Sequence, residues 1–134
     1  MATKEQFDKF FESDAFGVVG ASANREKFGN KVLRVYLQHG KKVIPVNPRE
    51  SEIEGISCVA DIQDLPPGVK SISVITPPQV TEQVVDKAIA KGIASIWMQP
   101  GAEHPDAVAL CREKGVNVIA DGSCLLVVLE YRDH

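Results

Sequence analysis

The sequence predicts an α/β protein with a Rossmann-like, three-layer architecture: an open parallel sheet of about five strands with helices on both faces. Short apolar runs alternate with segments of helical periodicity, which is typical of βαβ units whose helices cover a parallel sheet. Each apolar run also ends in a loop of turn-forming or polar residues. The five loops begin at Gly20, Asn47, Thr76, Gln99 and Asp121.

The first half of the chain is expected to begin with an amphipathic helix at residues 3–13, in which three phenylalanines share one face. Thr3 and Gln6 have the spacing of a capping box at its start. The expected elements that follow are a strand at 16–19, a helix at 29–39, a strand at 41–48, a short strand or loop at 56–59 and a helical turn at 61–65.

The second half is expected to continue this alternation. In its first helix Val80, Val84 and Val85 are expected to face inward, and Trp97 is expected to pack in the core. The expected elements are a strand at 71–75, a helix at 79–91, a strand at 94–98, a helix at 105–114, a strand at 116–120 and a closing helix or strand at 125–129.

Length and composition indicate one domain, residues 1–134, that can bury an ordinary core. The net charge is −3 and no run of Lys or Arg exceeds two residues, which argues against nucleic acid as a partner. No apolar stretch approaches the roughly 20 residues that cross a bilayer, so no membrane association is expected. The N-terminus lacks a signal-peptide pattern and the three cysteines form no C-x-x-C motif, so a cytoplasmic location is expected.

The stretch from Phe16 to His39 has the pattern strand, glycine turn, helix. Free backbone N–H groups in such a turn, and at the start of the following helix, form a seat for phosphate. Gly17, Gly20 and Gly29 do not fall on the G-x-G-x-x-G spacing, so a different nucleotide loop on a Rossmann-like frame is expected. The alternative is a tight turn that needs glycine only for its backbone angles.

The loops that follow the strands are expected to surround one crevice. In an open parallel sheet the carboxyl ends of the strands share one edge, and ligands bind there near the switch in strand order. Asn47-Pro48-Arg49 occupies the position where a typical NAD site has an acid. An asparagine followed by a cation suits a phosphorylated ribose, which favours NADP or coenzyme A (CoA), although Arg49 alone could be a solvated surface charge.

Five motifs in order resemble the family of stand-alone CoA-binding proteins, which are similar to the N-terminal domain of the succinyl-CoA synthetase alpha subunit. The resemblance covers about residues 13–130. The motifs are Gly20-Ala21-Ser22 with Gly29 behind it, Pro45-Val46-Asn47-Pro48, Ile75-Thr76-Pro77-Pro78, Trp97-Met98-Gln99-Pro100-Gly101-Ala102 and Asp121-Gly122-Ser123-Cys124.

The resemblance implies a CoA site made by these loops. By motif, Gly20, Ala21 and Ser22, with Gly29 behind them, would lie at the pyrophosphate. Asn47, Pro48 and Arg49 would lie near the phospho-adenosine; Thr76, Pro77 and Pro78 would line the nucleotide or pantetheine, and Gln99 and Gly101 would close the site.

The resemblance also implies a binding module for CoA or an acyl-CoA, a small-molecule nucleotide ligand, without catalysis of its own. The synthetase needs a second domain with a phosphorylated histidine, and residues 1–134 contain no counterpart of it, so no catalytic or metal-binding residue is named. Cys124 is the one candidate nucleophile and could form a mixed disulfide with CoA, or it could be a buried structural cysteine.

Two alternatives remain open at this stage. One is an NADP-binding oxidoreductase-like domain, against which stand the glycine spacing and the lack of a Tyr-x-x-x-Lys pair. The other is a regulatory or scaffolding protein that has lost its ligand. In that case the apolar patch of Phe7, Phe10 and Phe11 could serve a partner or a homodimer, although the patch could instead pack onto the protein's own sheet.

Overall fold

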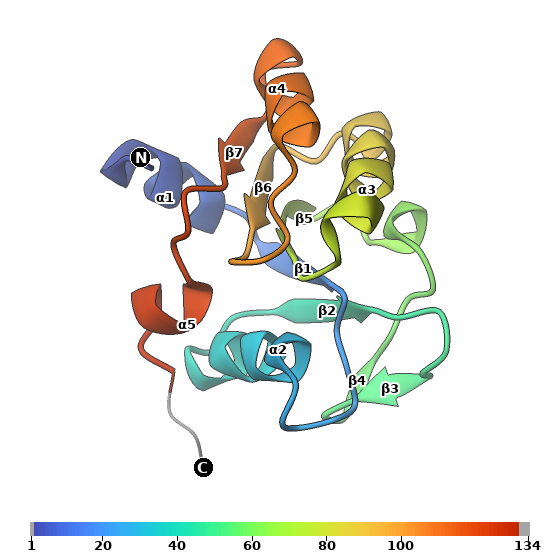
Figure 1. Cartoon of the computed structure of the whole chain (residues 1–134). Coiled ribbons are helices and arrows are strands. Elements are labelled where there is room, and N and C mark those ends of the chain that lie inside the picture. The colour runs from blue at the N-terminus through green and yellow to red at the C-terminus, as the bar shows by residue number, and fades with distance from the viewer. Residues whose placement is uncertain (1, 132–134) are drawn as a thin grey trace.

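The computed structural model describes residues 2–131 and confirms the predicted Rossmann-like fold (Figure 1). Its sheet has five parallel strands in the order β2-β1-β5-β6-β7. The strands are β1 (Ala15–Val19), β2 (Val43–Val46), β5 (Val69–Val74), β6 (Ser95–Met98) and β7 (Asn117–Ile119). The chain passes from β1 to β2 and then crosses back to β5 on the other side of β1. The switch in strand order therefore lies between β1 and β5, where ligands bind in folds of this kind.

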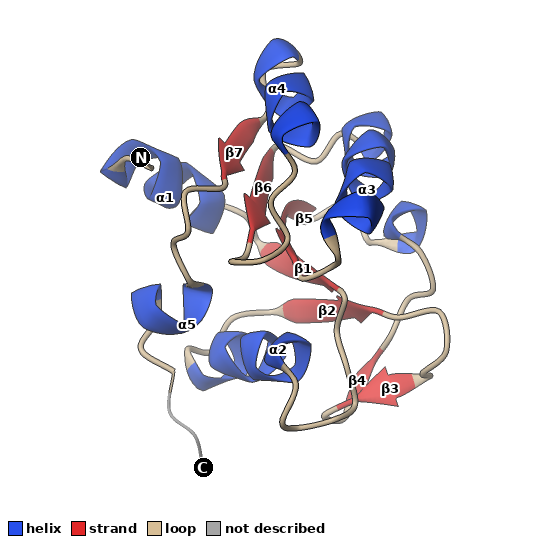
Figure 2. Ribbon diagram, viewed as in Figure 1, coloured by secondary structure: helices blue, strands red, loops and turns tan. Residues whose placement is uncertain are grey.

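Helices cover both faces of the sheet (Figure 2). One layer contains α1 (Lys4–Phe11), α2 (Phe28–Gln38) and the short α5 (Leu125–Val128). The opposite layer contains α3 (Pro78–Lys91), α4 (Pro105–Glu113) and the 3₁₀ turn η1 (Ile62–Asp64). None of the helices in the described part of the chain has the length and apolar character needed to cross a membrane.

The side chains of β1 show how the core divides into two halves. Ala15 and Val19 belong to the apolar cluster beneath α3 and α4, whereas Phe16 and Val18 belong to the cluster beneath α1 and α2. Successive side chains of a strand point to opposite faces, so a strand that is buried throughout contributes side chains to both clusters. This is the physical reason that β1 appears in the sequence as a continuous apolar run.

The N-terminal helix packs onto the sheet of its own chain. The predicted capping box is present, because Thr3 and Gln6 bond each other's backbone N–H groups. Phe10 is fully buried and meets Trp97 edge to face, with ring centroids 5.2 Å apart. Phe7 also contacts the ring of Trp97. The phenylalanine patch is thus used within the molecule, and a homodimer stays a prediction.

Three features of the structure differ from the sequence-based expectations or decide between alternatives that the sequence left open. The segment after β2 forms an antiparallel hairpin of β3 (Glu52–Ile53) and β4 (Ile56–Ser57). The strand β4 lies within the short strand or loop expected at 56–59, whereas the sequence pattern predicts no strand at β3. The closing segment, left open as helix or strand, is the helix α5. Val80, expected to face inward, is 39% exposed. It lies in the first turn of α3 and lines a pocket together with residues at the ends of β1 and β2.

Candidate functional site

The loop after β1 is held in a narrow space. Gly20 has a positive φ of 97°, and a Cβ added there would lie 2.2 Å from the carbonyl oxygen of Ile75 at the end of β5. A Cβ on Gly29, in the first turn of α2, would lie 2.2 Å from the carbonyl oxygen of Gly20. Glycine at both positions therefore lets the loop lie between the end of β5 and the start of α2. The tight-turn interpretation describes Gly20 correctly, and it is compatible with a phosphate seat.

The backbone of this loop offers unused hydrogen-bond donors. Among residues 2–131, none accepts a hydrogen bond from the N–H groups of Ala21, Ser22 or Ala23. The helix that follows begins after Lys27, with no side-chain cap from the described residues and no acid in its first turn. A cation beside the positive end of a helix dipole is unfavourable unless an anion binds there. Loop and helix start together form a favourable seat for an anion.

The helix that follows β5 also begins without a side-chain cap from the described residues and without an acid. The first turn of α3 begins at Pro77-Pro78, again without an acid and without a side-chain cap among the residues that the structure describes. In contrast, α4 is capped by His104 and carries Asp106 in its first turn. The two helix starts that flank the switch point between β1 and β5 are therefore both open to a negative ligand.

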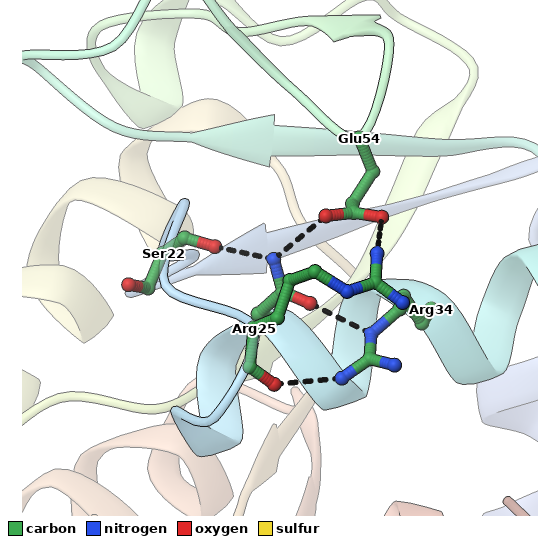
Figure 3. Close-up of polar contacts among 5 residues, drawn as sticks. Ser22, Arg25, Arg34 and Glu54 are labelled. Atoms are coloured by element: carbon green, nitrogen blue, oxygen red, sulfur yellow. Dashed lines mark hydrogen bonds and ion pairs between the residues drawn. The ribbon is translucent and has the colours of Figure 1, made fainter. Parts of the chain in front are cut away.

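A polar network centred on buried Asn30 and Arg34 holds the loop after β1 in place (Figure 3). Asn30 is fully buried, and its Nδ2 donates to the carbonyl oxygen of Ser22 at 2.8 Å and to Oε2 of Glu54 at 3.2 Å. Its Oδ1 accepts a hydrogen bond from Nε of Arg34 at 2.7 Å. Arg25 forms an ion pair with Glu54, and its carbonyl oxygen accepts a hydrogen bond from Arg34. Every polar atom of the Asn30 amide is thus engaged in fixing the loop.

Glu54 occupies an unusual backbone position in this network. It is the first residue of the two-residue turn between β3 and β4, with φ of 52°, and Gly55 follows with φ of 77°. Asparagine or aspartate is preferred where such a turn requires a positive φ. Glutamate is disfavoured at this positive φ, but its side chain is longer than that of asparagine or aspartate. The longer side chain of Glu54 reaches Asn30 and Arg25, which explains its presence here. Nothing in the local sequence pattern indicates this contact.

A pocket of about 270 Å³ lies at the carboxyl ends of β1, β2 and β5. This is near the lower end of the range of about 300–1,000 Å³ for small-molecule sites, so it suits one portion of a large ligand. Five predicted site residues line it: Gly20, Ala21, Asn47, Pro48 and Thr76. The sequence pattern does not predict the other polar lining residues of this pocket, which are Asp61, Gln83 and Lys87.

A second pocket of about 200 Å³ adjoins the first at Thr76. It lies between the ends of β5 and β6 and is also lined by Pro77 and Gly101, two further residues from the prediction. The hydroxyl group of Thr76 lies 2.8 Å from that of Thr81, so the two share a hydrogen bond. Thr76 therefore lies at the boundary between the two pockets.

The remaining predicted residues, Ser22, Gly29, Arg49, Pro78 and Gln99, line neither pocket. Gln99 is fully buried; its Oε1 accepts the N–H of Leu125 at 2.8 Å, while Nε2 has no partner among the described residues. Gln99 therefore accepts a hydrogen bond from the first backbone N–H group of α5. Arg49 is exposed, and its backbone N–H donates to Oδ1 of Asn47.

Asn47 links the ends of two strands. Its Nδ2 donates to the carbonyl oxygen of Ala21 at 3.0 Å, and its Oδ1 accepts the N–H groups of Arg49 and Glu50 at 2.7 and 3.0 Å. The side chain thus positions the first loop against the turn after β2. Because of the hydrogen bond to Ala21, Asn47 lies beside the first loop in the wall of the pocket.

An ion pair crosses the wall of the first pocket. Nζ of Lys87, on α3, lies 3.3 Å from Oδ1 and 3.2 Å from Oδ2 of Asp61. Oδ1 of Asp61 also accepts the N–H of Ile62 at 2.7 Å, at the start of η1. The carboxylate of Asp61 is therefore fixed by a hydrogen bond from the backbone, whereas the side chain of Lys87 is held through its ammonium group.

The thiols lie outside both pockets, as does the one acid–histidine group found within residues 2–131, which consists of Glu82, His104 and Asp106. Cys124 is half-buried at the start of α5, and burial raises the pKa of the Cys111 thiol to about 11. His104 contacts Glu82 through Nε2 at 3.1 Å and accepts the N–H of Ala107 on Nδ1. Since Nδ1 accepts, the neutral ring carries its proton on Nε2 and has no lone pair left for a metal ion.

A family model described as a CoA binding domain matches residues 14–130. The alpha subunit of ADP-forming acetate–CoA ligase II of Pyrococcus furiosus is 29% identical over 90 residues, which cover 66% of this chain and 20% of that subunit. The match thus spans about a fifth of the length of this relative.

Two solved structures share the fold over most of both chains. A conserved hypothetical protein from Pyrococcus furiosus is 38% identical with a TM-score of 0.81, and the match covers 85% of this chain and 97% of that one. A hypothetical protein from Pyrococcus horikoshii OT3 is 27% identical with a TM-score of 0.88, over 97% of this chain and 91% of that one.

Proposed function

This chain belongs to the CoA-binding domain family, and from that premise we propose that it binds coenzyme A at the carboxyl ends of β1, β2 and β5. The observation that carries the proposal is the coincidence of an anion seat and a pocket at the switch in strand order. The diphosphate of CoA lies on the N–H groups of Ala21, Ser22 and Ala23 and on the start of α2. The nucleoside end enters the pocket of Asn47 and Thr76, and the pantetheine arm runs toward Gly101.

The size of the two pockets supports this arrangement. Each holds about 200–270 Å³, and neither is large enough for a whole CoA molecule. A ligand with two ends joined by a diphosphate suits two small pockets that share Thr76 and lie beside one anion seat.

We also propose that the protein holds its ligand without acting on it, whether the ligand is free CoA or an acyl-CoA. No cysteine, histidine or serine lines either pocket within the described part of the chain. The hydroxyl group of Thr76 bonds to that of Thr81, and no carboxylate or imidazole among residues 2–131 forms a hydrogen bond with it that would activate it. Incubation with acetyl-CoA should release no CoA above the rate in buffer; hydrolysis that scales with protein concentration would contradict this part of the proposal.

The binding proposal is tested by thermal unfolding with CoA, acetyl-CoA and NADP in parallel. A ligand at a hundredfold excess over its dissociation constant stabilises the folded state by about 2.7 kcal/mol. For a domain of this size that is a rise of roughly 10 °C in Tm. We expect this rise with CoA. A rise with NADP and none with CoA would instead support the oxidoreductase-like alternative.

A further inference from the structure

We infer that Lys87 is the residue that selects a ligand whose ribose carries a phosphomonoester, and that Asp61 holds this lysine across the pocket while the ligand is absent. The inference rests on the proposed function and deepens it, since it assigns one group of the ligand to one side chain. Arg49, which the sequence pattern favoured for this role, lies outside the pocket wall.

The wall that carries Lys87 is one face of α3. Val80, Gln83, Val84 and Lys87 all line the pocket, and their spacing of three, four and seven residues places them on one side of a helix. Seven residues span about 10 Å along the helix axis. Lys87 therefore lies about two turns further along α3 than Val80, while the anion seat lies on the loop after β1, on a different element of the pocket wall.

Lys87 supplies the positive charge of this pocket. It is the one basic side chain that lines the pocket in the described part of the chain. Without ligand its charge is balanced by Asp61, and a phosphomonoester would bring about −1.5 to −2 charges against it. A charge-assisted hydrogen bond between ammonium and phosphate is stronger than a neutral one.

The ion pair is built so that the lysine can leave it. The side chains of Lys87 and Asp61 are 48% and 41% exposed, and ion pairs this open contribute about 0–1 kcal/mol. Exchanging the carboxylate for a phosphate therefore costs little. Asp61 stays in place because it caps η1 through Ile62, so the lysine is the partner that moves.

The phosphomonoester is common to two ligand classes. CoA carries it on the 3′ position of its ribose and NADP on the 2′ position, while dephospho-CoA and NAD lack it. A comparison of each ligand with its dephosphorylated partner isolates the contribution of that group, because the rest of each molecule is unchanged.

The experiment is isothermal titration of wild type, Lys87→Gln, Lys91→Gln and Arg49→Gln with CoA and dephospho-CoA. We expect Lys87→Gln to weaken CoA about tenfold or more and to leave dephospho-CoA unchanged, which is the effect of one charge-assisted hydrogen bond. Lys91→Gln is the matched control, since this lysine lies one turn further along α3, bonds to the carbonyl oxygen of Gln63 and lines no part of the pocket. It should leave both affinities as in wild type.

Three results would overturn the inference: equal effects of Lys87→Gln on both ligands, no effect on either, or loss of the CoA preference in Arg49→Gln alone. An Asp61→Asn variant, which keeps the acceptor for Ile62, should bind CoA more tightly and dephospho-CoA unchanged. Wild type that binds neither CoA nor dephospho-CoA refutes the proposed function itself. If it then prefers NADP over NAD and Lys87→Gln abolishes that preference, the role of Lys87 stands without CoA; if it binds none of the four, both fail.

Discussion

Replacing Gly29 by alanine should destabilise this protein, although the same change stabilises most helices. In a helix interior alanine is favoured over glycine by about 1 kcal/mol. At Gly29 the added Cβ would lie 2.2 Å from the carbonyl oxygen of Gly20 and 3.3 Å from Cα of Ala21. Both atoms belong to the backbone, so the strain cannot be relieved by turning a side chain. The loop after β1 has to move away from α2.

Overpacking of this kind costs about 1–3 kcal/mol, and contact with a backbone carbonyl places the cost toward the upper end. After the gain in helix propensity, the expected net loss is about 1–2 kcal/mol. This corresponds to roughly 4–8 °C in Tm for a domain of this size. The same displacement should weaken CoA binding, because it moves the N–H groups of Ala21 and Ser22 from the anion seat.

The assay is thermal unfolding of both variants, followed by CoA titration, with Gly68→Ala as the matched control. A Cβ on Gly68 would find its nearest neighbour at 4.0 Å, the Cβ of Asp14, in ordinary van der Waals contact. Gly68→Ala should leave CoA affinity unchanged and should melt within a few degrees of wild type. The reasoning fails if Gly29→Ala melts at or above the wild-type temperature and binds CoA as tightly.

Three further predictions concern separate parts of the molecule. Glu54→Asn suits the turn between β3 and β4 better but removes the carboxylate from Asn30, so it should weaken CoA binding several-fold without lowering Tm; unchanged affinity would show that the network does not shape the site. Hydrogen bonds from Ser123 and from the backbone hold the pKa of Asp121 at about 2, so this carboxylate stabilises the fold above pH 4 and loses that effect as the pH falls through 2. The difference in Tm between wild type and Asp121→Asn should accordingly narrow between pH 4 and pH 2, and a constant difference would contradict the assignment. Cys124→Ser should gain the same amount of CoA adduct as wild type after incubation with oxidised CoA, measured as added mass on each protein, since this thiol lies outside both pockets; an adduct present only in wild type would reveal a redox role.

Much of the fold could be predicted from the sequence because the signals are local. A strand buried on both faces is mostly apolar, and the buried serines of β5, Ser71 and Ser73, each have a hydrogen-bond partner. A helix on a sheet is apolar at about every third or fourth position. Glycine at Gly20 is likewise a local signal, since the chain needs a positive φ to turn from β1 toward α2. The sequence pattern predicts no strand at β3 and leaves β4 open as a strand or a loop, because each of these strands has two residues, too few for an alternating pattern.

The candidate site also has features that follow from the sequence and features that depend on the tertiary structure. The sequence by itself determined that loops after β1, β2 and β5 meet at one edge, because parallel strands must end together. Only the tertiary structure placed Lys87 and Asp61 in the pocket wall and brought Glu54 onto Asn30. These partners lie 26 and 24 residues apart, on elements whose exposed polar side chains follow no period that encodes a contact. Packing of apolar faces brings such elements together, and the polar groups that meet there are decided by three-dimensional distance alone.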